Sequence, residues 1–326
     1  MTDFEHYVTE TIDHYRDRVI WFQALNEPVY TDYSLPRKSG YDGATYARLT
    51  QAFAQAARKT NPQCKILAGI GALSQGRIME DFRTFFAAGG LECIDAVDIH
   101  LYPRIRPPEF AEPLMEELNG LMDKHGGRKP IWLTEIGYYA DDEPSSIPMS
   151  HKDFNQPLPN EQVQAAYAVR LAAIMFANGV EKIFYHAGTC AGVNSDNLQG
   201  VFFEYAGEPH KIYAAQAVMA SIFTPDCRFV KRLSLGDALK GYLFHEGKRL
   251  FAVVWSMRDT NSTSIELSNS KLKVWDIMGR EVKGNKLPVT GTPLYLIGND
   301  VNASTVEKEV KIISSPHHEE PCFKGP

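Results

Sequence analysis

The sequence lacks the features that mark several classes of protein. No apolar run approaches the twenty or so residues that a membrane helix requires. Positive charge is in the minority, since 34 Lys and Arg oppose 40 Asp and Glu for a formal net charge of −6 at pH 7. No basic stripe compensates for this balance, although proteins that grip nucleic-acid phosphates need one. The chain is therefore expected to bind neither membranes nor nucleic acid.

Cysteine is also scarce, and its placement argues against two kinds of framework. The cysteines are scattered, odd in number and without a Cys-x-x-Cys pair: Cys64, Cys93, Cys190, Cys227 and Cys322. Neither a zinc ribbon nor a complete disulfide framework fits them. Gly69, Gly71 and Gly76 miss the Gly-x-Gly-x-x-Gly spacing of a dinucleotide site. Because the chain also has no Gly-x-Ser-x-Gly elbow and no His-Glu-x-x-His helix, we expect no cofactor, no metal and no serine nucleophile.

The first two thirds of the chain contains a regular alternation of strand-like and helix-like segments. Strands of about six residues, apolar throughout, are predicted at 19–25, 65–70, 95–100, 130–134 and 182–187. Amphipathic helices are predicted at 4–17, 44–59, 77–88, 110–125, 160–178 and 208–223. Strands that are apolar on both faces and alternate with helices are typical of a parallel sheet covered by helices. The fold class is therefore α/β.

Beyond residue 225 the pattern changes to short strands separated by Gly, Asn and Asp turns. Such a pattern predicts a compact antiparallel β module, similar in plan to a β-sandwich. The last residues are polar and contain proline. The sequence thus divides into an α/β domain at 1–225, an accessory β domain at 226–300 and a polar tail at 301–326.

Two of the predicted strands end on a carboxylate. Glu27 follows IWFQALN and Glu135 follows IWLT. The site of a parallel α/β barrel lies at the carboxyl ends of its strands, and an unpaired buried carboxylate costs several kcal/mol. Each acid therefore has either a partner or a function. Glu27 could instead be a surface or capping acid, and Glu135 could pair with an arginine.

The neighbouring strand ends carry hydrogen-bonding and aromatic groups. His100 and Tyr102 are two residues apart, so they share one side of an extended chain. Tyr185 and His186 end the last predicted strand. These residues could equally be satisfied packing groups. Two carboxylates flanked by such groups are the equipment for cleaving a glycosidic bond, in which one acid has a raised pKa and the other stays ionised.

The order of these motifs resembles the clan A retaining glycoside hydrolases. Asn-Glu-Pro at 26–28, His-x-Tyr at 100–102 and Thr-Glu at 134–135 are similar to the residues that end barrel strands 4, 6 and 7 in that clan, as in families 39 and 5. The resemblance covers about 15–225 and implies a (β/α)8 TIM barrel with strands 4–8 present. It also implies that the β module is an accessory domain.

The resemblance implies a role for each residue. Glu27 would be the acid/base and Glu135 the nucleophile, with Asn26 holding the sugar hydroxyl next to the anomeric carbon. Tyr102 would donate a hydrogen bond to the nucleophile, and His100 would line the same pocket. Tyr185 and His186 stand where the clan usually has an aromatic platform, often Trp, so they are expected to bind substrate in a subsite of different shape.

Only about eighteen residues precede the predicted strand 4, so the barrel is expected to lack its first three βα units. The gap could mean a truncated chain, or a barrel completed by self-association with another copy. These eighteen residues lack a signal peptide's basic-then-apolar layout. The localisation is therefore unknown, although a longer parent could be secreted or periplasmic.

These observations predict a retaining glycosidase acting on a poly- or oligosaccharide, its carboxyl groups about 5 Å apart. The alternative is a non-catalytic carbohydrate-binding relative, or an inactive fragment of such an enzyme. The sugar, its linkage and exo or endo action are not indicated by the sequence.

Overall fold

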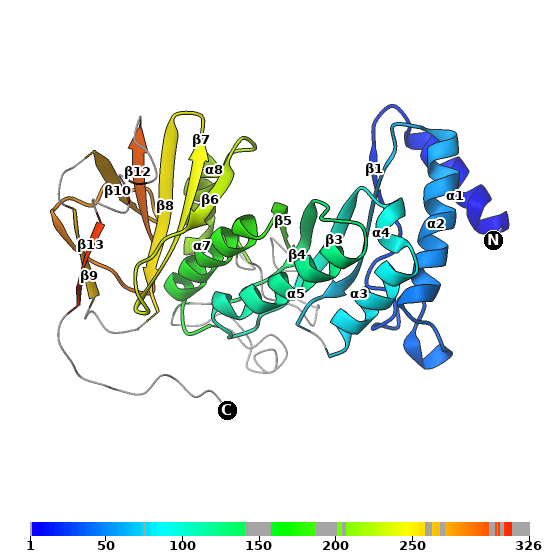
Figure 1. Cartoon of the computed structure of the whole chain (residues 1–326), viewed down its shortest axis with the longest axis horizontal. Coiled ribbons are helices and arrows are strands. Elements are labelled where there is room, and N and C mark those ends of the chain that lie inside the picture. Colours follow the sequence, from blue (N-terminus) through cyan, green and yellow to red (C-terminus); the bar gives the residue numbers. More distant parts are fainter. Residues whose placement is uncertain are drawn as a thin grey trace. The chain divides into compact units, whose positions relative to one another are not determined.

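The computed structural model describes residues 2–74, 76–140, 142, 158–186, 201–203, 207–257, 263–267, 271–299, 304, 306 and 310–314. It divides into two compact units, described separately below. The first comprises Met1–Pro103, Phe110–Gly137 and Asn178–His186, and the second comprises Arg104–Glu109, Tyr138–Ala177 and Ala187–Pro326. Each unit is thus assembled from separate stretches of the chain, and α7 and α8 fall with the antiparallel sheets (Figure 1).

The first unit is built on a parallel sheet of five strands in chain order. These strands are β1 (Trp21–Gln23), β2 (Lys65–Ala72), β3 (Ala96–Leu101), β4 (Ile131–Ile136) and β5 (Val180–Tyr185). Every neighbouring pair is parallel. All five predicted strands are therefore confirmed, and the sheet is a half-barrel. β1 is shorter than the predicted 19–25 because the chain leaves the sheet after Ala24, whose N–H still bonds Leu67 O at 3.1 Å.

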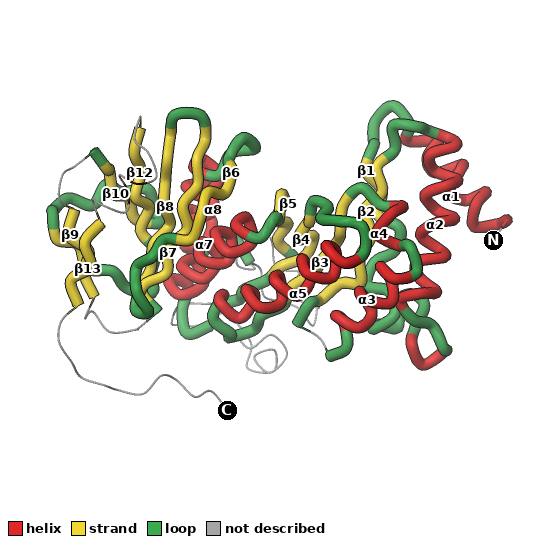
Figure 2. Tube along the Cα trace, in the orientation of Figure 1, coloured by secondary structure: helices red, strands yellow, loops and turns green. Residues whose placement is uncertain are grey.

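One helix precedes the first strand and the others connect the strands. They are α1 (Thr2–Tyr15), α2 (Gly43–Thr60), α3 (Ile78–Ala87), the short α4 (Gly90–Cys93) and α5 (Ala111–Lys124). Helix α1 packs on α2, α2 on α3, and α3 on α5. Asp42 begins α2 by accepting a hydrogen bond from Thr45 N at 2.8 Å, which satisfies one of the free N–H groups of the first turn. Figure 2 shows these helices alternating with the strands. None of the described helices combines the length and apolar character of a membrane span.

One face of the sheet carries large apolar side chains around a cavity. Trp21, Leu67, Trp132 and Phe184, from four of the strands, line a volume of about 250 Å³. The rings of Trp21 and Trp132 lie 4.3 Å apart between centroids. Among the residues that the structure describes, none accepts a hydrogen bond from the buried indole N–H of Trp132. In a closed barrel such a face is the packed interior.

Within its described residues, the second unit combines two helices with two antiparallel sheets. The helices are α7 (Glu161–Ala177) and α8 (Lys211–Ile222). One sheet has the order β10-β12-β8-β7-β6, with bounds Leu272–Asp276, Leu294–Asn299, Arg249–Ser256, Leu239–Glu246 and Arg228–Arg232. The other has the order β11-β9-β13, with bounds Lys286–Pro288, Thr263–Leu267 and Val310–Ser314. The antiparallel module is present as expected, and β13 lies in the segment predicted as a polar tail.

A buried ion pair connects α7 to other parts of this unit. The Arg170 guanidinium on α7 bonds both carboxylate oxygens of Glu109, at 3.0 and 2.5 Å. The indole N–H of Trp255 donates to the same carboxylate at 2.7 Å. Because both charges are largely shielded from water, each depends on the other for compensation.

Candidate active site

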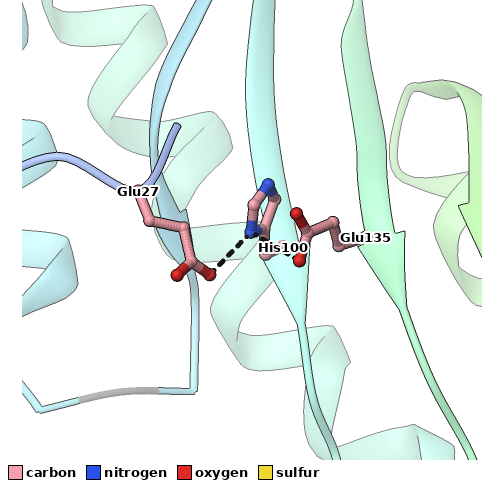
Figure 3. Close-up of side chains that lie close together, drawn as sticks. All are labelled: Glu27, His100 and Glu135. Carbon is pink, nitrogen blue, oxygen red and sulfur yellow. Dashed lines mark hydrogen bonds and ion pairs between the residues drawn. The ribbon is translucent and has the colours of Figure 1, made fainter. Parts of the chain in front are cut away.

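Three side chains, from the ends of β3 and β4 and from the loop after β1, meet at the carboxyl edge of the parallel sheet. Figure 3 shows the His100 ring between the carboxylates of Glu27 and Glu135. His100 Nδ1 lies 2.8 Å from Glu27 Oε1 and 3.4 Å from Glu135 Oε2. One oxygen of each carboxylate and a ring nitrogen of His100 all lie within 4.8 Å of one another. The two acids that the sequence singles out are therefore close neighbours.

An irregularity between β3 and β4 aims Glu135 at His100. Ile99 pairs with Leu133, but the next pair is His100 with Glu135, so Thr134 is an extra residue on β4. Side chains normally alternate along a strand, whereas an inserted residue allows two successive side chains to serve one face. Thr134 consequently bonds Asp98, while Glu135 lies beside His100.

Glu27 is held by a strained loop. It has φ 43°, and Val29 has φ 75°, a left-handed conformation that β-branched residues rarely adopt. Thr31 Oγ1 donates to Glu27 O at 2.5 Å, and Val29 N donates to Ser34 O at 3.2 Å. Such strain, maintained by the surrounding hydrogen bonds, is common at functional sites.

Tyr30 is a site residue that the strand-end motifs do not indicate, because it lies in the loop after Glu27. Its hydroxyl hydrogen-bonds the Glu27 carboxylate and also accepts from Ala72 N at 3.3 Å. Gly71, at φ +115°, makes room for this ring, because a Cβ there would lie 2.7 Å from Tyr30 Cε1. Gly69 likewise allows the backbone of Asp98 to approach β2. The two glycines that resemble a nucleotide motif therefore serve the packing of this site.

The other predicted site residues lie in different positions relative to the two carboxylates. The Tyr102 hydroxyl donates to Glu135 Oε2 at 2.5 Å. The ring of His186 packs edge-on against that of Tyr102, with centroids 6.1 Å apart. Asn26 is exposed next to Glu27. Tyr185 ends β5, where alternation turns it to the face opposite Phe184 and the cavity.

The electrostatics of Glu27 differ from the prediction that the acid has a raised pKa. Burial raises the pKa of Glu27, but hydrogen bonds from His100 and Tyr30, with the charges of His100 and His186, outweigh burial and lower it. Burial lowers the pKa of His100, but its bond to Glu27 and the charges of Asp98, Glu135 and Glu27 raise it overall. These opposite pKa shifts favour the form of the pair in which the imidazole carries the proton.

A third carboxylate lies beneath His100. The Asp98 side chain is 1 % exposed, and its Oδ2 lies 3.9 Å from His100 Nε2. It accepts hydrogen bonds from Thr134 Oγ1 and from Gln23 Nε2, the latter at 2.9 Å. Burial raises the pKa of Asp98 to about 6, against the opposing effects of the His100 charge and the Thr134 hydroxyl.

Glu27, His100 and Glu135 are also the described residues that could together contact a cation. We propose acid–base chemistry, rather than ion binding, as the role of these three residues. The expectation that the site uses no metal and no cofactor remains a prediction.

Comparison with known proteins places the fold. No family model matches the chain, and no curated protein matches it in sequence. Its structure is similar to a glycoside hydrolase family 30 subfamily 8 xylanase from Clostridium acetobutylicum, with TM-score 0.58 and 13% identity over 91% of this chain and 71% of that one. It is also similar to a family 44 xyloglucanase from Paenibacillus polymyxa, with TM-score 0.55 and 13% identity over 91% and 70%.

A family 30 endoxylanase from Clostridium papyrosolvens C71 gives TM-score 0.53 and 15% identity, over 91% of this chain and 71% of that one. These similarities concern families 30 and 44, whereas the sequence motifs suggest 39 and 5. At the level of the fold, the resemblance to clan A glycoside hydrolases is confirmed.

Proposed function

We propose that the chain carries the active site of a retaining glycoside hydrolase, with Glu135 as nucleophile and Glu27 as acid/base. The observation that supports this most is the pair of carboxylates at the strand ends, with oxygens within 4.8 Å of each other. Retaining enzymes have carboxyl groups about 5–5.5 Å apart, whereas inverting enzymes need about 6.5–9.5 Å for a water molecule.

The reaction proceeds by double displacement. A Glu135 oxygen attacks the anomeric carbon as the glycosidic C–O bond breaks, and the leaving oxygen takes a proton from Glu27. Glu27 then removes a proton from a water molecule that attacks the anomeric carbon, which releases Glu135. The Tyr102 hydroxyl orients the Glu135 carboxylate before the attack, through its 2.5 Å hydrogen bond.

The surrounding residues are proposed to bind a poly- or oligosaccharide. The amide of exposed Asn26 is beside the acid/base, in a position to hold a sugar hydroxyl. The imidazole of His186, which follows β5 and packs against Tyr102, offers a contact to the sugar ring next to the cleaved bond. Tyr185 is on the opposite face of the sheet, so the contact expected from it is not part of the proposal. His100 orients Glu27 through their 2.8 Å contact.

The finer form of the fold is also a proposal. We infer that the half-barrel is the strand 4–8 portion of a (β/α)8 barrel, whose other three strands cover the face bearing Trp21 and Trp132. Two observations support this inference: the apolar cavity on that face and the buried indole N–H of Trp132, which has no acceptor among the described residues. The covering strands could come from the same polypeptide or from self-association.

The experiment is hydrolysis by the purified chain of a panel of polysaccharides and aryl glycosides, with the anomeric configuration of the first product followed by NMR. We expect retention of configuration, and loss of turnover in Glu135→Gln. The matched control is Glu92→Gln, which removes an exposed carboxylate in α4 and leaves turnover unchanged. Inversion, or full activity of Glu135→Gln, would contradict the proposal. Binding without hydrolysis, unchanged in Glu135→Gln, would favour the non-catalytic alternative.

A further inference from the structure

The buried carboxylate of Asp98 has no role in the double displacement, yet the fold maintains it directly beneath the site. Burial of a lone carboxylate is unfavourable unless hydrogen bonds or an opposite charge compensate it. Gln23 on β1 and Thr134 on β4 donate hydrogen bonds to the Asp98 carboxylate. The imidazole of His100, itself 1 % exposed, lies 3.9 Å from the Asp98 carboxylate. These contacts align Asp98 with His100 rather than with solvent.

His100 faces charged and titratable groups from every strand end around it. Glu27 and Tyr30 come from the loop after β1, and Glu135 comes from β4. Asp98 lies on β3, the same strand as His100, and Tyr102 directly follows that strand. His186 follows β5 and acts on Glu27. The three carboxylates around His100 favour its protonated form.

We propose that Asp98 is a positioning residue that acts through His100, keeping on the imidazole the proton that Glu27 delivers to the leaving group. This inference rests on the proposed function and extends it. Glu27 and His100 then form one acid that shares a proton, and the charge of Asp98 sets how tightly that proton is held. This sharing of a proton also explains how Glu27 can be ionised in the resting site and still act as the acid.

The proton follows a short path. As the glycosidic C–O bond lengthens, its electron pair moves to the leaving oxygen, which takes the proton of Glu27. The proton on His100 Nδ1 reaches Glu27 across the 2.8 Å hydrogen bond. In the second step Glu27 takes a proton from the attacking water and returns one to His100. One glycosidic bond and one water molecule are consumed per cycle, and the pair regains its starting charge.

The first test measures His100 in the resting protein, without turnover. NMR titration of the imidazole signals, with His100 assigned by its loss in His100→Gln, gives the pKa of His100 in the wild type and in Asp98→Asn. We expect Asp98→Asn to lower this pKa by about one unit or more, since an opposite charge at this distance shifts a pKa by roughly 1–3 units. An unchanged His100 pKa would overturn the proposal, whatever the protein hydrolyses.

The second test is the pH profile of kcat/KM. The basic limb reports loss of the last proton from the Glu27–His100 pair, so Asp98→Asn should move this limb to lower pH. Asp81→Asn is the matched control, because it also removes a buried carboxylate, one that lies in α3 and is paired with Arg37 instead of His100. It should leave the limb in place. A lower rate with an unmoved limb in Asp98→Asn would show a structural role only and refute the proposal.

Thr134→Val provides an independent variant if Asp98→Asn does not fold. It removes the hydroxyl that stabilises the Asp98 carboxylate, so Asp98 holds its own proton more strongly and supports the charge of His100 less. We expect a smaller change in the same direction, and a His100 pKa equal to the wild type would again refute the proposal. Failure of the proposed function looks different: hydrolysis would persist in Glu135→Gln while the NMR shift in Asp98→Asn remained.

Discussion

Replacement of Gly71 by alanine tests how the site positions Glu27. Gly71 has φ +115°, and a Cβ at this position would lie 2.7 Å from Tyr30 Cε1 and 3.0 Å from the Tyr30 hydroxyl oxygen. The substitution therefore strains the backbone and displaces the ring from the Glu27 carboxylate. Gly40→Ala is the matched control, since Gly40 has φ +87° and no atom within 4 Å of the new Cβ.

The magnitude follows from two contributions. An alanine at positive φ costs about 1–2 kcal/mol at either glycine. Gly71→Ala additionally loses the Tyr30 hydrogen bond to a charged group, worth about 1.5–3 kcal/mol. We therefore expect Gly71→Ala to be more destabilising than Gly40→Ala by about 1–3 kcal/mol. The pKa of Glu27 should also rise, because the Tyr30 hydrogen bond lowers it.

Urea unfolding of both variants, in the wild type and in a Tyr30→Ala background, provides the measurement. The excess cost of Gly71→Ala should disappear when the ring is absent, as a double-mutant cycle would report. Equal free energies of unfolding for the two glycine variants would refute this reasoning. So would an excess cost that persisted in Tyr30→Ala.

The remaining predictions concern Glu135 and the second unit. Tyr102→Phe removes the hydroxyl that donates to the Glu135 carboxylate, so kcat/KM should fall roughly 10- to 150-fold. Exposed Tyr33→Phe is the control, and an unchanged kcat/KM in Tyr102→Phe contradicts the role. Glu109→Ala leaves the Arg170 charge buried and unpaired, and should lower the free energy of unfolding by about 3–5 kcal/mol in a urea titration. A loss below about 1 kcal/mol would contradict that account.

Much of the secondary structure could be predicted because its signals are local. The five parallel strands are apolar runs bounded by turn residues, and each predicted position matches a strand of the structure within a few residues. Glu27 and Glu135 were identifiable because each interrupts such a run abruptly. The strand at 310–314 was missed, since it is short and its pairing partner β9 is far away in sequence.

The environment of the site could not be predicted because it depends on tertiary contacts. Nothing in the local sequence marks Glu27 or Val29 for positive φ, which is usually the property of glycine or asparagine. The extra residue Thr134 is visible only once β3 and β4 are paired. The lowered pKa of Glu27 likewise depends on Tyr30 and His100, which reach it from different elements.

The most direct test of the central claim is to trap the covalent intermediate. A 2-deoxy-2-fluoro glycoside with a good leaving group, made from a sugar that the substrate panel identifies, slows both steps because fluorine destabilises the oxocarbenium-like transition state. Peptide mass spectrometry then locates the attached sugar. The account predicts a sugar ester on Glu135, absent in Glu135→Gln. Turnover without any labelled carboxylate, or a label on Glu27, would contradict it.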